Sequence, residues 1–135
     1  MVTRIGVSNP AEKYKPMLAG VMNLKQSIGL IGGKPGKALY LVGMDGDEFS
    51  YLDPHYVQPS ANRKNVESLL PTYFCDSYRT VKYDSLDPSV GLGFYIANTA
   101  DLQDFLLGME YLNKQFGKEF FIYTEMACPE YIKRE

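Results

Sequence analysis

The chain of 135 residues contains a single histidine, His55, and an aspartate, Asp53, precedes it by two positions. In an extended backbone, residues i and i+2 project from the same face, about 6.6 Å apart at a rise of about 3.3 Å per residue. A carboxylate and an imidazole at this spacing can touch. An aspartate bonded to one ring nitrogen leaves the other nitrogen free as a base and stabilises the imidazolium that forms. The pair therefore supplies two of the three groups of a nucleophile-base-acid triad.

Pro54, between the two residues, indicates where the pair lies. Proline biases the preceding residue toward extended structure, fixes its own φ and cannot donate to a strand ladder. We therefore expect the pair at a strand end or edge, where side chains meet solvent. The simpler interpretation is a turn after a strand that carries a solvated histidine, and from these residues alone it is the favoured one.

A glycine-rich segment, Gly32, Gly33, Lys34 and Pro35, is the second candidate for chemistry. Phosphate binding does not fit, because the spacing from Gly32 to Gly36 is one residue short of a P-loop and Ala38 replaces the required serine or threonine. A strand is also expected after the segment, where a P-loop has a helix. Taken by itself, the segment predicts an ordinary hairpin loop.

Two strands should place Asp53. The aliphatic and aromatic run 38–44 predicts one strand, and the turn residues 45–47 lead into a second strand that ends at Asp53. Before them we expect a short helix over 16–23, a strand over 27–33 and a turn over 34–37.

One long helix is predicted after residue 98. Thr99 can cap it, Gly117 can end it, and its apolar residues recur every three or four positions, at Leu102, Phe105, Leu106, Met109, Leu112 and Phe116. We expect this helix to cover one face of the sheet.

The remaining segments complete an α+β fold with a mostly antiparallel sheet and flanking helices. The apolar run 90–97 predicts a central strand, and 58–71 a polar connection with a helical turn near 65–70. Further strands are expected at 72–74, 80–86 and 118–125, followed by a loose tail over 127–135.

Composition limits the class of protein. The length suits a single domain, residues 1–135, and 14 basic against 16 acidic residues without charged runs argue against nucleic-acid binding. Two cysteines without CxxC spacing favour a reducing compartment, and no apolar run is long enough for a membrane span. We expect a cytoplasmic protein without stable membrane insertion. One histidine and two scattered cysteines have no metal-ligand spacing, and we expect no metal or cofactor.

Two ordered blocks resemble a known family. The segment 26–59, QSIGLIGGKPGKALYLVGMDGDEFSYLDPHYVQP, is similar to the autophagy-specific cysteine endopeptidases, or autophagins, whose hallmarks are a GGxP loop, a hairpin and a D-P-H motif. The segment 85–105, SLDPSVGLGFYIANTADLQDF, is similar to the family's second L-D-P block, strand and helix. The resemblance covers roughly Ile5 to Leu107.

This resemblance implies the C-terminal half of a papain-like cysteine protease. Its members cut ubiquitin-like autophagy modifiers after a C-terminal glycine and release them from phosphatidylethanolamine. By the resemblance, His55 is the general base for a cysteine and Asp53 its orienting carboxylate. Gly32, Gly33, Lys34 and Pro35 match the regulatory loop that lies over the groove and lifts when the modifier's tail enters.

The nucleophile does not fit the family's pattern. The family's cysteine lies far upstream of D-P-H in a motif with tryptophan, and this chain has no tryptophan. Cys75, beside acidic Asp76 in a predicted strand, and Cys128, in the tail, are poor substitutes. We expect the chain to supply the base and its orienter without the thiol, and to be almost inactive alone.

The expected partners follow from this interpretation. They are the ubiquitin-like modifier and the missing N-terminal half of the protease, and a surface meant for that half could support self-association. The alternative is a non-catalytic module that binds a ubiquitin-like modifier, which the 11 tyrosines would also suit.

Overall fold

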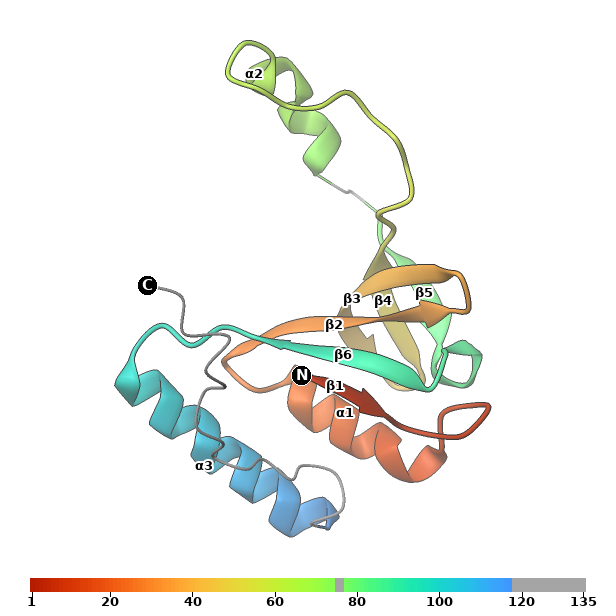
Figure 1. Ribbon diagram of the computed structural model, residues 1–135, viewed down its shortest axis with the longest axis vertical. Helices are drawn as coiled ribbons and strands as arrows, with labels where there is room; N and C mark the ends of the chain where they lie inside the picture. The colour runs from red at the N-terminus through yellow and green to blue at the C-terminus, as the bar shows by residue number, and fades with distance from the viewer. Residues whose placement is uncertain (75–76, 118–135) are drawn as a thin grey trace, which may run out of the picture.

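The computed structural model describes residues 1–74 and 77–117 and confirms an α+β fold with an antiparallel sheet (Figure 1). Over these residues the sheet has the strand order β1-β6-β2-β3-β4-β5. The strands are β1 Val2–Arg4, β2 Ser27–Lys34, β3 Lys37–Asp45, β4 Glu48–Leu52, β5 Arg79–Lys82 and β6 Ser89–Phe94. The helices are α1 Lys15–Met22, α2 Val66–Leu69 and α3 Thr99–Phe116, with 3₁₀ turns at Glu12–Tyr14, Leu70–Tyr73 and Tyr83–Ser85. The predicted strand 118–125, the tail and both cysteines lie outside the described residues.

The core lies between one face of the sheet and α1, which begins with a proline in its first turn as predicted. Leu18 and Val21 of the helix and Leu30, Leu41 and Phe49 of the strands are at most 1% exposed. We call this buried face of the sheet the inner face and the opposite one the outer face. The predicted central strand 90–97 is observed as β6, which ends at Phe94 and lies between the edge strand β1 and β2.

The hairpin of β3 and β4 ends beside the candidate site. Its turn at residues 46–47 was predicted, and its strands pair in antiparallel register, Leu41 with Tyr51 and Gly43 with Ser50. The register shifts by one residue between these two pairs.

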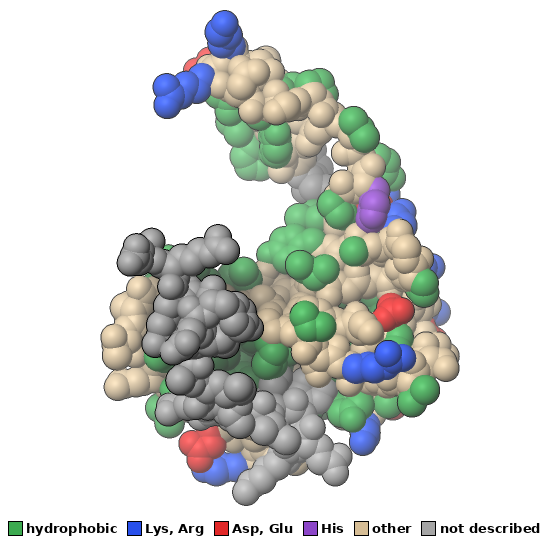
Figure 2. All heavy atoms as spheres, in the orientation of Figure 1, with side chains coloured by type: hydrophobic (Ala, Val, Ile, Leu, Met, Phe, Trp, Pro, Cys, Tyr) green, Lys and Arg blue, Asp and Glu red, His purple; other side chains and the backbone are tan. Residues whose placement is uncertain are grey.

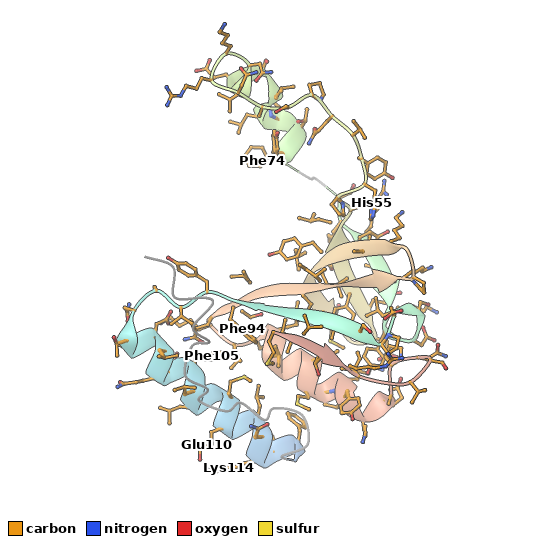
Figure 3. All side chains as sticks on the ribbon, in the orientation of Figure 1. His55, Phe74, Phe94, Phe105, Glu110 and Lys114 are labelled. Atoms are coloured by element: carbon orange, nitrogen blue, oxygen red, sulfur yellow. The ribbon has the colours of Figure 1, made fainter. Side chains whose placement is uncertain are left out.

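The prediction that α3 covers a face of the sheet is wrong, because α3 packs mainly against α1 (Figure 1). Leu112 is buried against α1. Contact with the sheet comes at the end of β6, where the rings of Phe94 and Phe105 are 4.7 Å apart (Figure 3). The first and last residues of the predicted apolar stripe, Leu102 and Phe116, are exposed.

Asn98, not Thr99, caps α3. The backbone of Asn98 is extended, and its side-chain oxygen accepts a hydrogen bond from the amide of Asp101 at 3.0 Å. Gln26, which is 3% exposed, donates to the carboxylates of Asp101 and Asp104, each at 2.9 Å. The start of α3 is therefore fixed to the residue that precedes β2.

The predicted strand at 72–74 is also wrong. These residues belong to the 3₁₀ turn and its end, in a segment with α2 that projects away from the sheet (Figure 1). A proline in this segment cannot donate to a strand ladder. The predicted strand 80–86 ends at Lys82, because Tyr83 turns into the core and is 1% exposed.

Candidate active site

Asp53 and His55 are in contact just beyond the end of β4. Figure 3 shows His55 where the chain leaves the sheet for the projecting segment. The Nδ1 of His55 lies 2.7 Å from the Oδ1 of Asp53, and the backbone N–H of His55 donates to the same oxygen at 3.1 Å. A turn at Pro54 and His55 makes this contact, so the predicted extended geometry is wrong. The turn after the strand and the contact between the two side chains were both predicted and are both confirmed.

The two side chains differ in exposure. The side chain of Asp53 is 4% exposed and that of His55 is 44% exposed. The hydrogen bonds from the ring and then from the backbone of His55 lower the pKa of Asp53 from 3.8 to about 2, and the ammonium of Lys37 contributes further. The carboxylate is therefore ionised at neutral pH. When His55 Nδ1 donates to it, Nε2 remains as a base.

Two cations that sequence reasoning did not identify lie at the other oxygen of Asp53. The Nζ of Lys37 is 3.1 Å from Oδ2, and the Nη1 of Arg79 is 4.0 Å from it. The hydrogen bond with Asp53 raises the pKa of Lys37. The predicted hairpin of β3 and β4 was a signal for Lys37 alone, because it brings the start of β3 beside the end of β4. The antiparallel pairing of β5 with β4, which brings Arg79 there, is seen only in the structure.

The glycine-rich segment lies close to this pair. Gly32, Gly33 and Lys34 are the last residues of β2, and Pro35 opens the turn into β3, so the segment is a tight hairpin rather than a free loop. Gly33 has a φ of +137°, and a Cβ there would overlap the backbone oxygen of the residue that starts β3. The hairpin and His55 line one shallow depression, together with Asp87 and Ser89.

The outer face of the sheet carries an apolar row. It consists of five residues that are paired from strand to strand across the sheet. In the order β1, β6, β2, β3 and β4 they are Val2, Gly91, Ile31, Tyr40 and Leu52. Apart from the glycine, they are 39% to 83% exposed. All of them except Leu52 border an apolar hollow of about 490 Å³, and Pro54 of the D-P-H motif also lines it. Figure 2 shows hydrophobic side chains over the sheet near the histidine.

Comparison with known proteins identifies the family. A family model described as the peptidase C54 catalytic domain matches residues 1–107. The chain belongs to the peptidase C54 family. This assignment confirms the resemblance to cysteine endopeptidases that the two sequence blocks indicated.

The curated relatives of this chain include several proteins named as cysteine proteases. "Cysteine protease ATG4a" of Arabidopsis thaliana is 36% identical over 124 residues, 90% of this chain and 27% of the relative. "Cysteine protease ATG4B" of Oryza sativa subsp. indica is 33% identical over 128 residues, 93% of this chain and 27% of the relative. "Probable cysteine protease ATG4" of Debaryomyces hansenii is 35% identical over 102 residues, which are 76% of this chain and 20% of the relative. The chain thus spans a fifth to about a quarter of the length of these relatives.

The described residues contain neither a membrane-spanning helix nor a cluster of metal ligands. No helix in residues 1–74 or 77–117 is both long and apolar enough to cross a membrane. Over the same residues, no three side chains of His, Cys, Asp or Glu gather in a way that could hold a metal ion.

Proposed function

We propose that this chain is the C-terminal part of a papain-like cysteine endopeptidase. The enzyme cleaves ubiquitin-like autophagy modifiers after their C-terminal glycine and releases them from phosphatidylethanolamine. Membership of the peptidase C54 family supports the reaction class. The single observation that carries the proposal for this chain is the 2.7 Å contact between His55 Nδ1 and Asp53 Oδ1.

In this mechanism His55 is the general base and acid. Its Nε2 takes the proton of a cysteine thiol, and the thiolate attacks the carbonyl carbon of the modifier's glycine. The imidazolium then donates the proton to the leaving amine, and the acyl-enzyme is hydrolysed by a water that His55 activates. Asp53 holds the ring in the required tautomer and stabilises the imidazolium.

The thiol and the oxyanion donors come from the N-terminal half of the protease. The apolar row and hollow of the outer face are the surface on which that half packs, because the hollow reaches Pro54 between the two catalytic side chains. Neither Cys75 nor Cys128 is the nucleophile in this proposal. The chain alone is therefore almost inactive, and the assembled enzyme acts in the cytoplasm.

The hairpin at Gly32, Gly33, Lys34 and Pro35 gates the substrate. It shares a depression with His55, so a modifier's tail that reaches the base must pass it. Glycines suit this role because a backbone without side chains can approach a narrow tail closely.

The decisive experiment supplies the missing half. The chain is joined to the preceding part of the Arabidopsis cysteine protease, and cleavage of a modifier extended beyond its C-terminal glycine is measured. We expect cleavage, and we expect His55→Ala to lower turnover by roughly 10³-fold or more while modifier binding changes little. Lys64→Ala, an exposed change on the projecting segment, is the matched control. Turnover of His55→Ala close to that of the control would refute the assignment.

The alternative, a non-catalytic module that binds the modifier, is tested with the chain alone. A modifier with a thiol-reactive group at its C-terminus should form no covalent adduct. An adduct at Cys75 or Cys128 would show that the chain has its own nucleophile. Reversible binding, together with a failure of the joined enzyme to cleave, would favour the module.

A further inference from the structure

The two carboxylate oxygens of Asp53 have different partners. Oδ1 accepts both hydrogen bonds from His55, from the ring and from the backbone. Oδ2 is buried and takes part in neither of these bonds. A buried carboxylate oxygen is costly unless positive charge lies close to it. The groups that supply this charge are the ammonium of Lys37 and the guanidinium of Arg79.

The two cations come from the strands on either side of β4. β4 lies between β3 and β5, and both neighbours run antiparallel to it, so both begin where β4 ends. Side chains alternate along a strand, and Lys37 is two residues before buried Leu39, as Arg79 is two residues before buried Val81. Both cations therefore belong to the inner-face row of their strands, the row that Asp53 extends beyond β4.

Arg79 is also tied to the turn that carries the histidine. Its Nη1 donates to the hydroxyl of Tyr56 at 2.6 Å, and its guanidinium carbon lies 5.0 Å from the centre of that ring. The hydrogen bond with Tyr56 raises the pKa of Arg79 further above its ordinary value. Arg79 thus connects β5 to both ends of the segment 53–56.

We propose that Lys37 and Arg79 are positioning residues that hold Oδ2 of Asp53 and thereby direct Oδ1 to Nδ1 of His55. This inference rests on the proposed function, in which the Asp53–His55 pair is the base and its orienter. Lys37 acts as a direct ion pair, and Arg79 acts at longer range and through Tyr56. Loss of either cation allows the carboxylate to rotate. It therefore weakens the preference of neutral His55 for the form with its proton on Nδ1.

The test is nuclear magnetic resonance on the chain itself, labelled at the aspartate carboxyls and the histidine ring. Lys37→Met should move the titration midpoint of Asp53 upward from about 2 toward 3.8, by roughly 0.5 pH unit or more. Arg79→Met should give a smaller upward shift, and both changes should increase the fraction of neutral His55 that carries its proton on Nε2. Lys37→Arg should restore most of the wild-type behaviour. Lys34→Met, which removes a charge from the same hairpin, should change neither quantity.

The outcomes separate this inference from the proposed function. The positioning role is refuted if Lys37→Met and Arg79→Met both keep the wild-type His55 tautomer and the wild-type titration midpoint of Asp53. That result would leave the Asp53–His55 pair intact. A wild-type chain whose neutral His55 does not favour the Nδ1–H form would instead refute the proposed function. If Lys37→Met loses the dispersed amide spectrum of a folded protein, Lys37→Gln takes its place with the same expected shift.

Discussion

The side chain of Asp53 is almost fully buried and yet ionised at neutral pH. Its side chain is 4% exposed, and the hydrogen bonds from His55 keep its pKa at about 2. The environment therefore stabilises the ionised form despite the loss of water around it. This is the state in which an orienting carboxylate has to remain throughout a reaction cycle.

The depressed pKa has a consequence for stability. A carboxyl with a folded pKa of about 2 and an unfolded pKa near 3.8 stabilises the fold fully above the unfolded value, and this contribution is lost as the pH falls toward 2. The difference in free energy of unfolding between wild type and Asp53→Asn should narrow over that range. Urea unfolding at a series of pH values measures it, and a difference that stays constant down to pH 2 would contradict the assignment of the low pKa.

The same substitution tests catalysis. In the enzyme joined to its nucleophile-bearing half, Asp53→Asn should lower kcat by roughly 10³- to 10⁴-fold, because an amide no longer selects the tautomer with Nε2 free. KM should change little, since the side chain does not contact the modifier in the proposed mechanism. Steady-state cleavage kinetics separate the two effects, and a defect in KM alone would assign Asp53 to binding instead.

At the scale of elements, the sequence was sufficient for the hairpins but not for the details that set the site. Turn residues at 45–47 predicted the second hairpin, yet spacing alone could not show that Asp53 and His55 meet through a turn. Asn98 was missed as the cap because both it and Thr99 can cap a helix, and only the backbone conformation distinguishes them. Lys37 was not identified because a predicted hairpin does not fix which side chains meet beyond its strand ends, where Asp53 lies.

The tight hairpin between β2 and β3 gives a matched pair of substitutions. Gly33→Ala should destabilise the fold by about 2–4 kcal/mol, since the added Cβ meets backbone at a φ of +137°. Gly36→Ala, where φ is +76° and the space is open, should cost only about 1 kcal/mol. Chemical denaturation of both variants decides the order, and equal costs would show that the hairpin is looser than its pairing indicates.

At the scale of the molecule, the two faces of the sheet differ in what covers them. The inner face is closed by α1, whereas the outer face exposes its apolar row across five strands. Family membership could be inferred from sequence because the motifs are local. The apolar row could not, because it depends on the register between strands that are distant in the chain.

An exposed apolar row predicts that the isolated chain associates with itself. The weight-average mass in sedimentation equilibrium should rise with concentration, and Ile31→Lys should reduce this rise. Leu107→Lys, a change of the same kind at an exposed position on α3, should have no effect. Equal effects of the two substitutions would place the association elsewhere.

The register shift in the β3–β4 hairpin is a β-bulge that determines the chemistry at the far end. Leu41 faces the core before the bulge and Met44, paired with Phe49, packs toward it after the bulge, so one extra residue exchanges the two faces of β3. If Val42 were paired without a bulge, in the register set by Met44 and Phe49, Leu41 and the inner-face residues before it would turn to the outer face. Lys37, which now faces Asp53, would then point to the outer face. The unpaired Val42, about five positions away, therefore keeps Lys37 and Asp53 on the same face of the sheet.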